Sequence, residues 1–177
     1  VSVLLPALKQ VRPTIMLIVP LIIEKIFKHQ VLATFNSKAI TRALYGWAPT
    51  RRFLHRLAGK KLNKVFGGRI RFLGIGGAKL DPQAEQFLLD AKLNYAIGYG
   101  LTETAPLIAG ALPGLTRLGS TGPAMEGVEV RLDNVNEKGE GELVAKTPSV
   151  MAGYYKNPEA TAEVFTEDGW FRTRDIA

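Results

Sequence analysis

The chain has no cysteine and only two histidines, His29 and His55, among its 177 residues. The absence of cysteine excludes disulfide bonds, a thiol nucleophile and any zinc site that uses cysteine ligands. Two histidines leave little room for a multi-histidine metal centre, so we expect both to be surface or packing residues. This composition favours a reduced, cytoplasmic setting.

The chain also lacks an apolar run long enough to cross a membrane. Its most apolar stretch, residues 14–23, is about half of the roughly 20 residues that a membrane span needs, and Pro20 interrupts it. No small-residue cleavage site follows, so we expect no signal peptide. The stretch predicts a buried strand followed by a helix that begins at Pro20.

Acidic residues are scarce in the first part of the chain. Residues 1–72 hold 14 bases and one acid, a net charge of +13, and residues 73–177 hold 9 bases and 15 acids, a net of −6, which together give +7. A basic segment of this kind favours nucleic acid, an anionic membrane surface or an acidic partner segment. We expect the bases on helix faces without interleaved aromatic side chains, which argues against a nucleic-acid partner. Such a face can still hold a protein at an anionic membrane, so peripheral membrane association stays open.

The hydrophobic pattern changes twice along the chain. Residues 21–66 have the spacing of amphipathic helices. From Arg69 on, apolar strand patterns alternate with glycine loops and with a helix that Asp81 caps, and after Pro123 short strands and polar turns predominate. We therefore predict an α/β fold in two parts, a parallel α/β sheet subdomain over residues 1–118 and a β-rich, barrel-like subdomain over residues 119–177. The apolar helix positions expected to face the core are Ile22, Ile26, Phe27, Leu54, Leu57, Leu62 and Phe66.

A first glycine loop, Gly76, Gly77 and Ala78, follows a predicted buried strand. Glycines at this position let a flat ring or a phosphate approach the backbone closely, although an ordinary tight turn needs the same residues. Ligands of parallel α/β sheets bind at the carboxyl ends of the strands, which makes this loop a candidate binding element.

A second loop, residues 98–104, follows the next strand and contains Tyr99, Thr102 and Glu103. A hydroxyl beside a carboxylate at a strand end suits magnesium and phosphate, because magnesium takes one or two carboxylates together with phosphate oxygens. Helix capping by Thr102 or Thr104, with Glu103 in the positive first turn, explains the same residues.

Asp175 follows a strand pattern near the end of the chain. A carboxylate in this position can accept hydrogen bonds from two ribose hydroxyls, as acidic residues do in dinucleotide folds. An ordinary exposed aspartate is the alternative.

Taken together, these motifs resemble the adenylate-forming (AMP-binding) ligase superfamily, and most closely its long-chain fatty acid–CoA ligases. The segments that carry the resemblance are residues 76–78, 98–106, 141–143, 150–158 and 169–177. The resemblance implies that a carboxylate attacks the α-phosphate of ATP to give an acyl-adenylate and pyrophosphate, after which coenzyme A takes the acyl group. Ligases for aryl or short acids, and adenylation domains that load a carrier protein, are the alternatives within the superfamily.

The resemblance also implies roles for individual residues. Those implied for the nucleotide site are Gly76, Gly77 and Ala78 at the adenine, Tyr99 stacked on the ring, Gly100 in the same loop, Thr102 at the α-phosphate, Glu103 on magnesium, and Asp175 at the ribose. Thr102 and Glu103 are thus the implied catalytic residues, and Glu103 the implied metal ligand. The family's phosphate loop and its C-terminal domain with the catalytic lysine have no counterpart in the chain, so we expect an internal fragment that is inactive by itself.

One residue departs from the family pattern inside a motif. Arg174 stands where the family has a glycine. If this position requires a positive φ, arginine costs about 1 kcal/mol there and weakens the contact of Asp175 with the ribose.

Overall fold

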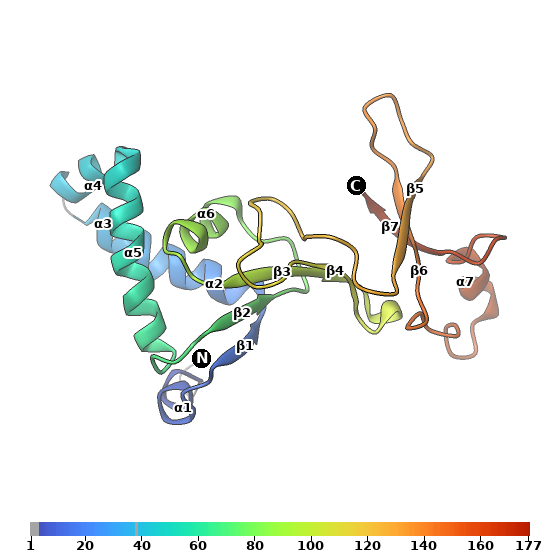
Figure 1. Ribbon diagram of the computed structural model, residues 1–177, viewed down its shortest axis with the longest axis horizontal. Coiled ribbons are helices and arrows are strands. Elements are labelled where there is room, and N and C mark those ends of the chain that lie inside the picture. Colours follow the sequence, from blue (N-terminus) through green and yellow to red (C-terminus); the bar gives the residue numbers. More distant parts are fainter. Residues whose placement is uncertain (1–3, 38) are drawn as a thin grey trace. The chain divides into compact units, whose positions relative to one another are not determined.

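The computed structural model describes residues 4–37 and 39–177 of the chain and confirms the predicted mixture of parallel and antiparallel sheet (Figure 1). The chain divides into two compact units. Unit 1 comprises Val1–Ile97 and Ala111–Gly122, and unit 2 comprises Gly98–Gly110 and Pro123–Ala177. The domain division expected between residues 118 and 119 stays a prediction.

Helices fill most of the first 65 residues of unit 1, and those from Pro20 onward were predicted. They are α1 (Leu4–Val11), α2 (Pro20–Ile26), the π-helix η1 (Phe27–Leu32), α3 (Ala33–Asn36), α4 (Ala39–Gly46) and α5 (Ala48–Val65). Helix α2 begins at Pro20 because proline suits the first helical position, where its missing N–H has no partner to lose. Pro49 likewise lies in the first turn of α5. None of the helices described is long and apolar enough to cross a membrane.

A parallel sheet of three strands is the frame of unit 1. Strand β2 (Phe72–Ile75) pairs with β1 (Ile15–Ile18) on one side and with the first residues of β3 (Tyr95–Gly100) on the other. Helix α6 (Pro82–Asp90) connects β2 to β3, and the side chain of Asp81 caps it by accepting from the N–H groups of Gln83 and Ala84. The predicted cap is therefore confirmed.

The prediction that the strand before Pro20 is buried was wrong. Strand β1 is the edge strand of its sheet, and the side chains of Ile15 and Leu17 are 64% and 82% exposed. Only the alternate residues, Met16 and Ile18, pack against the core. Because successive side chains of a strand point to opposite faces, an edge strand that is covered on one face buries only half of an apolar run.

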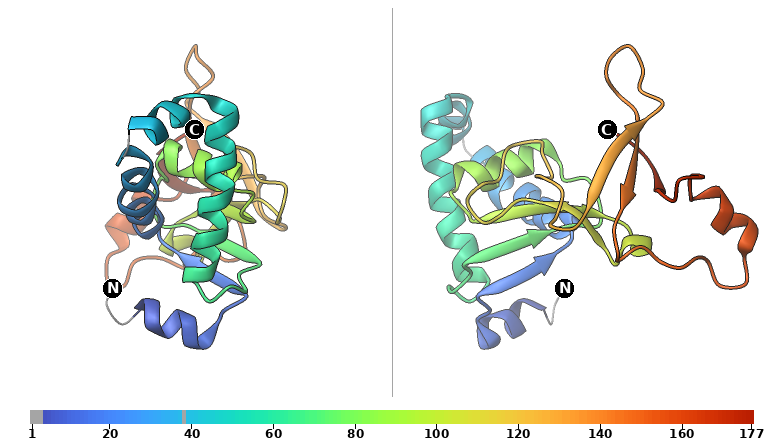
Figure 2. Two further views of the ribbon diagram at one scale, coloured as in Figure 1. Left: turned by 90° about the vertical axis from the view of Figure 1, so that its left-hand side faces the viewer. Right: turned by 45° about the vertical axis from the view of Figure 1, so that its right-hand side comes forward.

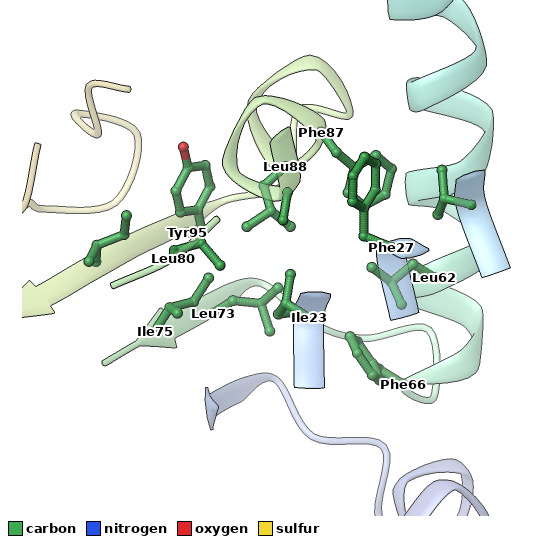
Figure 3. Close-up of a cluster of buried hydrophobic side chains, with 13 residues drawn as sticks. Ile23, Phe27, Leu62, Phe66, Leu73, Ile75, Leu80, Phe87, Leu88 and Tyr95 are labelled. Carbon is green, nitrogen blue, oxygen red and sulfur yellow. The ribbon is translucent and has the colours of Figure 1, made fainter. Parts of the chain in front are cut away.

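The core of unit 1 lies between the sheet and helices α2, α5 and α6 (Figure 3). Its buried residues include Phe27, as expected, and Ile23, whereas Ile22 and Ile26 of the expected face are only half-buried. The buried line of α5 runs through His55, Gly59, Leu62 and Phe66, whereas Leu57 of the expected face is 49% exposed. The apolar residues alone were a misleading guide to this face, because a histidine and a glycine occupy two of its positions.

Gly59 in this line permits the close approach of two helices. A Cβ atom added to Gly59 would lie 2.7 Å from the Cβ of Ala91, at the end of α6. Helices α5 and α6 therefore pack with little side-chain bulk between their backbones at this point.

Unit 2 consists mainly of antiparallel strands. They are the end of β3, β4 (Leu107–Gly110), β5 (Glu129–Asp133), β6 (Glu142–Lys146) and β7 (Phe171–Ile176), and the helical segments are η2 (Thr102–Thr104) and α7 (Pro158–Glu163). Strand β6 pairs with β5 and β7, and Asn157 caps α7, so the predicted hairpin and short helix are confirmed.

The prediction that residues 98–100 form a loop was wrong. Gly98, Tyr99 and Gly100 continue strand β3 and pair antiparallel with β4. A Cβ atom on Gly100 would lie 1.6 Å from the carbonyl oxygen of Pro106, so glycine there allows the two backbones to approach. The loop begins only at Leu101.

Candidate functional site

The loop of Gly76, Gly77 and Ala78 follows directly after β2, as expected. The N–H of Gly76 donates to the carbonyl of Ile18 at 3.3 Å, while Gly77 and Ala78 are exposed. Gly77 has a φ of 89°, and the space where a Cβ would stand is open. Glycine is thus required here by backbone conformation, and the exposed backbone beside it is open to a flat ligand.

The two threonines of the loop after β3, Thr102 and Thr104, differ in burial and in hydrogen bonding. Thr104 is fully buried, and its hydroxyl accepts from the N–H of Leu101 at 3.1 Å and donates to the carbonyl of Pro106 at 2.7 Å. Thr104 therefore performs the capping that sequence reasoning held open for this loop. Thr102 is exposed, and its hydroxyl has no hydrogen bond to any residue that the structure describes.

Glu103 is held by a segment 50 residues later in the chain. The hydroxyl of Tyr154 donates to Oε1 of Glu103 at 2.9 Å, and the N–H of Met151 donates to the Glu103 carbonyl at 2.7 Å. Ser149 also donates to the carbonyl of Thr104. The hydrogen bond to Glu103 raises the pKa of Tyr154 above its usual value, so the phenol remains a donor at neutral pH. Sequence reasoning assigned no role to Tyr154, although the motif of residues 150–158 contains it.

Tyr99 and Asp175 also meet across a long stretch of sequence. The Tyr99 hydroxyl donates to Oδ2 of Asp175 at 2.7 Å, and the Asp175 N–H donates to the hydroxyl of Thr173 at 3.2 Å. Burial, together with the bond to Asp175, raises the pKa of Tyr99 to about 12. Within the described part of the chain Oδ1 of Asp175 accepts no hydrogen bond, and each carboxylate oxygen has two lone pairs, so this group retains room for further donors.

Arg174, immediately before Asp175, has a φ of 61°. The position thus adopts the left-handed conformation that suits the family's glycine. Its side chain pairs with Glu163 at 3.0 Å on the surface, and its N–H donates to Glu142 at 3.3 Å. A non-glycine residue in this conformation is strained by about 1 kcal/mol or more.

The structure tests whether these residues fit a magnesium ion. Among residues 4–37 and 39–177, no group of three or more histidine, aspartate and glutamate side chains could hold a metal ion. An all-protein cage is therefore not formed by these residues. A single carboxylate beside a nucleotide does fit, because magnesium is commonly held by one or two carboxylates with phosphate oxygens and water. Glu103 has one oxygen engaged by Tyr154 and a second, Oε2, available for such an ion.

The two histidines were expected to be surface or packing residues, and the structure places one in each setting. His29 is exposed, and His55 is buried with Nδ1 3.0 Å from Oδ2 of Asp90 and Nε2 2.8 Å from the hydroxyl of Tyr45. Edge-on contacts with the rings of Phe27 and Phe87 complete its surroundings. Burial lowers the pKa of His55, so this side chain is a neutral packing residue that connects α4, α5 and α6.

The predicted site residues fall into two groups. Tyr99, Thr102, Glu103 and Asp175 belong to unit 2, which contains both carboxylate–tyrosine pairs. The loop of residues 76–78 belongs to unit 1. Unit 2 by itself therefore presents two partly open carboxylates, a neutral phenol and a free hydroxyl, which are groups that recognise sugar hydroxyls and metal-bound phosphates.

Comparisons with known proteins agree with the resemblance seen in the sequence. The family model for AMP-binding enzymes matches residues 1–155. Long chain acyl-CoA synthetase 1 of Arabidopsis thaliana is 35% identical over 99% of this chain and 30% of its own length, and long-chain-fatty-acid–CoA ligase 4 of Saccharomyces cerevisiae is 33% identical over 96% of this chain and 26% of its own length. The chain thus spans less than a third of these relatives.

Solved structures give the same result. The A-PCP didomain of carboxylic acid reductase from Segniliparus rugosus, in complex with AMP, is 30% identical with a TM-score of 0.67 over 96% of this chain and 23% of that one. A malonyl-CoA ligase in a ternary product complex with methylmalonyl-CoA and AMP is 25% identical with a TM-score of 0.65, over 97% of this chain and 33% of that one. From the matched family model, the shared fold and the ordered motifs, this chain belongs to the AMP-binding enzyme family of adenylate-forming ligases.

Proposed function

We propose that this chain is part of an ATP-dependent acyl-CoA ligase that activates a long-chain fatty acid as its acyl-adenylate and transfers it to coenzyme A. The observation that carries the proposal is the pair of carboxylates on family motifs, Glu103 and Asp175, each held by a tyrosine hydroxyl. The substrate class is supported by the long-chain acyl-CoA synthetases that match almost the whole chain.

Residues of three family motifs would bind the nucleoside end of ATP. The backbone of residues 76–78 offers a flat approach to adenine, and the ring of Tyr99 offers a stacking surface. The hydroxyl of Tyr99 is bonded to Asp175, and this bond fixes the carboxylate whose remaining lone pairs accept from the ribose hydroxyls. Because the phenol stays neutral below about pH 12, it does not repel the phosphates.

The phosphate end would be bound in the loop after β3. Thr102 donates its exposed hydroxyl toward the α-phosphate, and Glu103 would hold magnesium, which neutralises phosphate charge when bound. Tyr154 orients Glu103 by donating to Oε1. None of these residues needs to act as an acid or base, because adenylyl transfer depends mainly on positioning and charge neutralisation.

The reaction would proceed in two balanced steps. A fatty acid carboxylate oxygen attacks the α-phosphorus of ATP, and the bond to pyrophosphate breaks. The thiolate of coenzyme A then attacks the acyl carbon, and AMP leaves with the bonding electron pair.

The proposal is tested by measuring acyl-CoA and AMP formed by the complete protein, with acids from acetate to long-chain fatty acids and benzoates. We expect the largest kcat/KM with long-chain acids, and a loss of about 100-fold in Glu103→Gln, because the substitution removes the carboxylate proposed to hold the magnesium ion that neutralises phosphate charge. Glu167→Gln, at an exposed glutamate with no role in the site, is the matched control. Turnover with aryl or short acids only, or only with a carrier-protein thiol in place of coenzyme A, would correct the substrate or the acceptor.

We also place this protein in the cytoplasm and in peripheral contact with a membrane. The cysteine-free sequence and the net charge of +13 over residues 1–72 support this placement. A long-chain fatty acid partitions into lipid, so contact with a bilayer would bring the enzyme to its substrate.

A further inference from the structure

Helix α5 presents one continuous exposed face that carries no acid. Its sequence contains neither aspartate nor glutamate. The exposed residues follow one another at alternating intervals of one and three positions, which places them on one side of the helix. Figure 2 shows α5 at the periphery of unit 1. The residues of this exposed α5 face are Arg52, Phe53, Arg56, Leu57, Lys60, Lys61 and Lys64.

Four of the five positive charges of this face have no ion-pair partner within the described part of the chain. Arg52 lies 3.8 Å from Asp90, but the other four bases form no ion pair with any described residue. Between Glu24 and Asp81 the sequence contains no acidic residue at all. An anionic partner would therefore meet a field that the protein itself does not offset.

Apolar side chains lie within the same exposed α5 face. Phe53 is 59% exposed and Leu57 is 49% exposed, and basic residues flank both of them on the helix surface. Trp47, directly before the helix, and Leu44 are 66% and 45% exposed. The expectation that no aromatic residues interleave with the bases was therefore wrong. Exposed aromatic and aliphatic residues flanked by lysine and arginine are typical of helices that lie in the interface of a membrane.

An apolar groove adjoins this face. It has a volume of about 190 Å³ and lies between α5 and the segment that contains η1 and α3. Leu57 and Lys61 of the exposed α5 face line it together with Val31 and Phe35. If the acyl chain of a lipid lay in this groove, the ammonium group of Lys61 could contact the negative head group of the same lipid.

We propose that the exposed α5 face, with Trp47 at its start, docks this protein on an anionic lipid bilayer. The bases contact the lipid head groups, while Phe53, Leu57 and Trp47 enter the boundary of the acyl chains. A nucleic acid would contact the lysine and arginine side chains with its phosphates. It would offer no apolar surroundings to the aliphatic side chains of Leu44 and Leu57, whereas a bilayer would. The inference rests on the proposed membrane contact and not on the ligase chemistry, since lipid binding needs neither ATP nor a fatty acid.

Co-sedimentation of the complete protein with vesicles tests this inference. The vesicles are phosphatidylcholine alone and phosphatidylcholine with one fifth phosphatidylserine, at low and high salt. We expect binding only to the anionic vesicles, and weaker binding in high salt. The triple variant R56Q/K60Q/K64Q should weaken it by about fivefold for each charge removed.

Two further variants separate the apolar and basic contributions. Phe53→Gln with Leu57→Gln should weaken vesicle binding severalfold while the salt dependence stays, because these substitutions leave every charge in place. Lys138→Gln with Lys156→Gln removes two exposed lysines of unit 2 and should change vesicle binding little.

Two results would overturn the proposal. One is equal affinity for both kinds of vesicle, and the other is a loss of affinity per removed charge in this control that equals the loss in the triple variant. Tighter binding to a single-stranded oligonucleotide that competes with the vesicles would instead make the face a nucleic-acid surface. Acyl-CoA formation by the triple variant in detergent reports separately on the ligase function.

Discussion

Two tyrosines of strand β3, four residues apart, each donate a hydrogen bond to a carboxylate, and the two pairs differ in burial. Tyr95 and Glu85 are 2% and 3% exposed, and the carboxylate of Glu85 also accepts from the N–H of Gly119, 3.1 Å from both of its oxygens. Asp175, the partner of Tyr99, is exposed, and within the described chain its Oδ1 has no hydrogen-bond donor.

The difference shows how surroundings decide the task of the same chemical pair. The buried carboxylate accepts from two groups of the chain itself, because an unsatisfied buried charge is very costly. It fixes the loop before Gly119 to α6, and its burial closes it to a ligand. The exposed carboxylate is oriented by one tyrosine and keeps acceptor positions open, which a binding site requires.

The largest expected effect is on the buried pair. Glu85→Ala leaves two buried donors, the Tyr95 hydroxyl and the Gly119 N–H, without an acceptor and should lower the free energy of unfolding by about 3 kcal/mol. Urea unfolding of the complete protein measures this change. Asp175→Ala should change the unfolding free energy by less than about 0.5 kcal/mol, since the group is exposed. Equal losses in the two variants would abolish the distinction between the pairs.

The exposed pair should show the opposite response. Asp175→Asn removes the charge that strengthens hydrogen bonds from the ribose, so the affinity for ATP should fall about tenfold. A titration of the complete protein with ATP measures the affinity, and Glu167→Gln serves as the control. An Asp175→Asn variant that binds ATP like the wild type would remove Asp175 from the site.

The buried histidine of unit 1 extends the comparison to pH. Burial lowers the pKa of His55 in the folded state, so the unfolded chain binds a proton first as the pH falls below about 6.5. The contribution of His55 is complete above this pH and is lost below it. Between pH 7 and pH 5 the wild type should therefore lose more stability than His55→Gln. Urea unfolding of both proteins at the two pH values measures this difference. Equal losses of stability in the two proteins would show that His55 is protonated as readily in the folded protein as in the unfolded chain.

The smallest expected effect is at Arg174. Arg174→Gly relieves the strain of a positive φ and loses only an exposed ion pair with Glu163, so stability should rise by about 0.5–1 kcal/mol. If the strain also displaces Asp175, affinity for ATP should increase severalfold. An unchanged ATP affinity would show that Arg174 does not weaken nucleotide binding.

Local signals in the sequence predicted much of the fold. Pro20, Asp81 and Asn157 mark helix starts that the structure confirms, because capping and proline geometry depend on neighbouring residues only. The hairpin of β5 and β6 was equally predictable from its alternating pattern and polar turn. The positive φ at Arg174 was considered only because the family has a glycine at this position.

The features that the sequence did not predict depend on distant partners. The exposure of Leu17 follows from the edge position of β1, and strand pairing at Gly100 follows from the approach of Pro106. The buried face of α5 includes His55 because Asp90, 35 residues away, satisfies its ring nitrogen. The bond between Tyr99 and Asp175 joins residues 76 positions apart, and only the family motifs placed both in one site beforehand.

The central claim, that this protein activates long-chain fatty acids as adenylates, is tested most directly by ATP–pyrophosphate exchange in the complete protein without coenzyme A. This assay isolates the first half-reaction, in which Thr102, Glu103 and Asp175 are proposed to act. We predict exchange that depends on added acid and is greatest with long-chain fatty acids. If no acid in the series, from acetate through long-chain fatty acids to benzoates, supports exchange, the proposed function is contradicted.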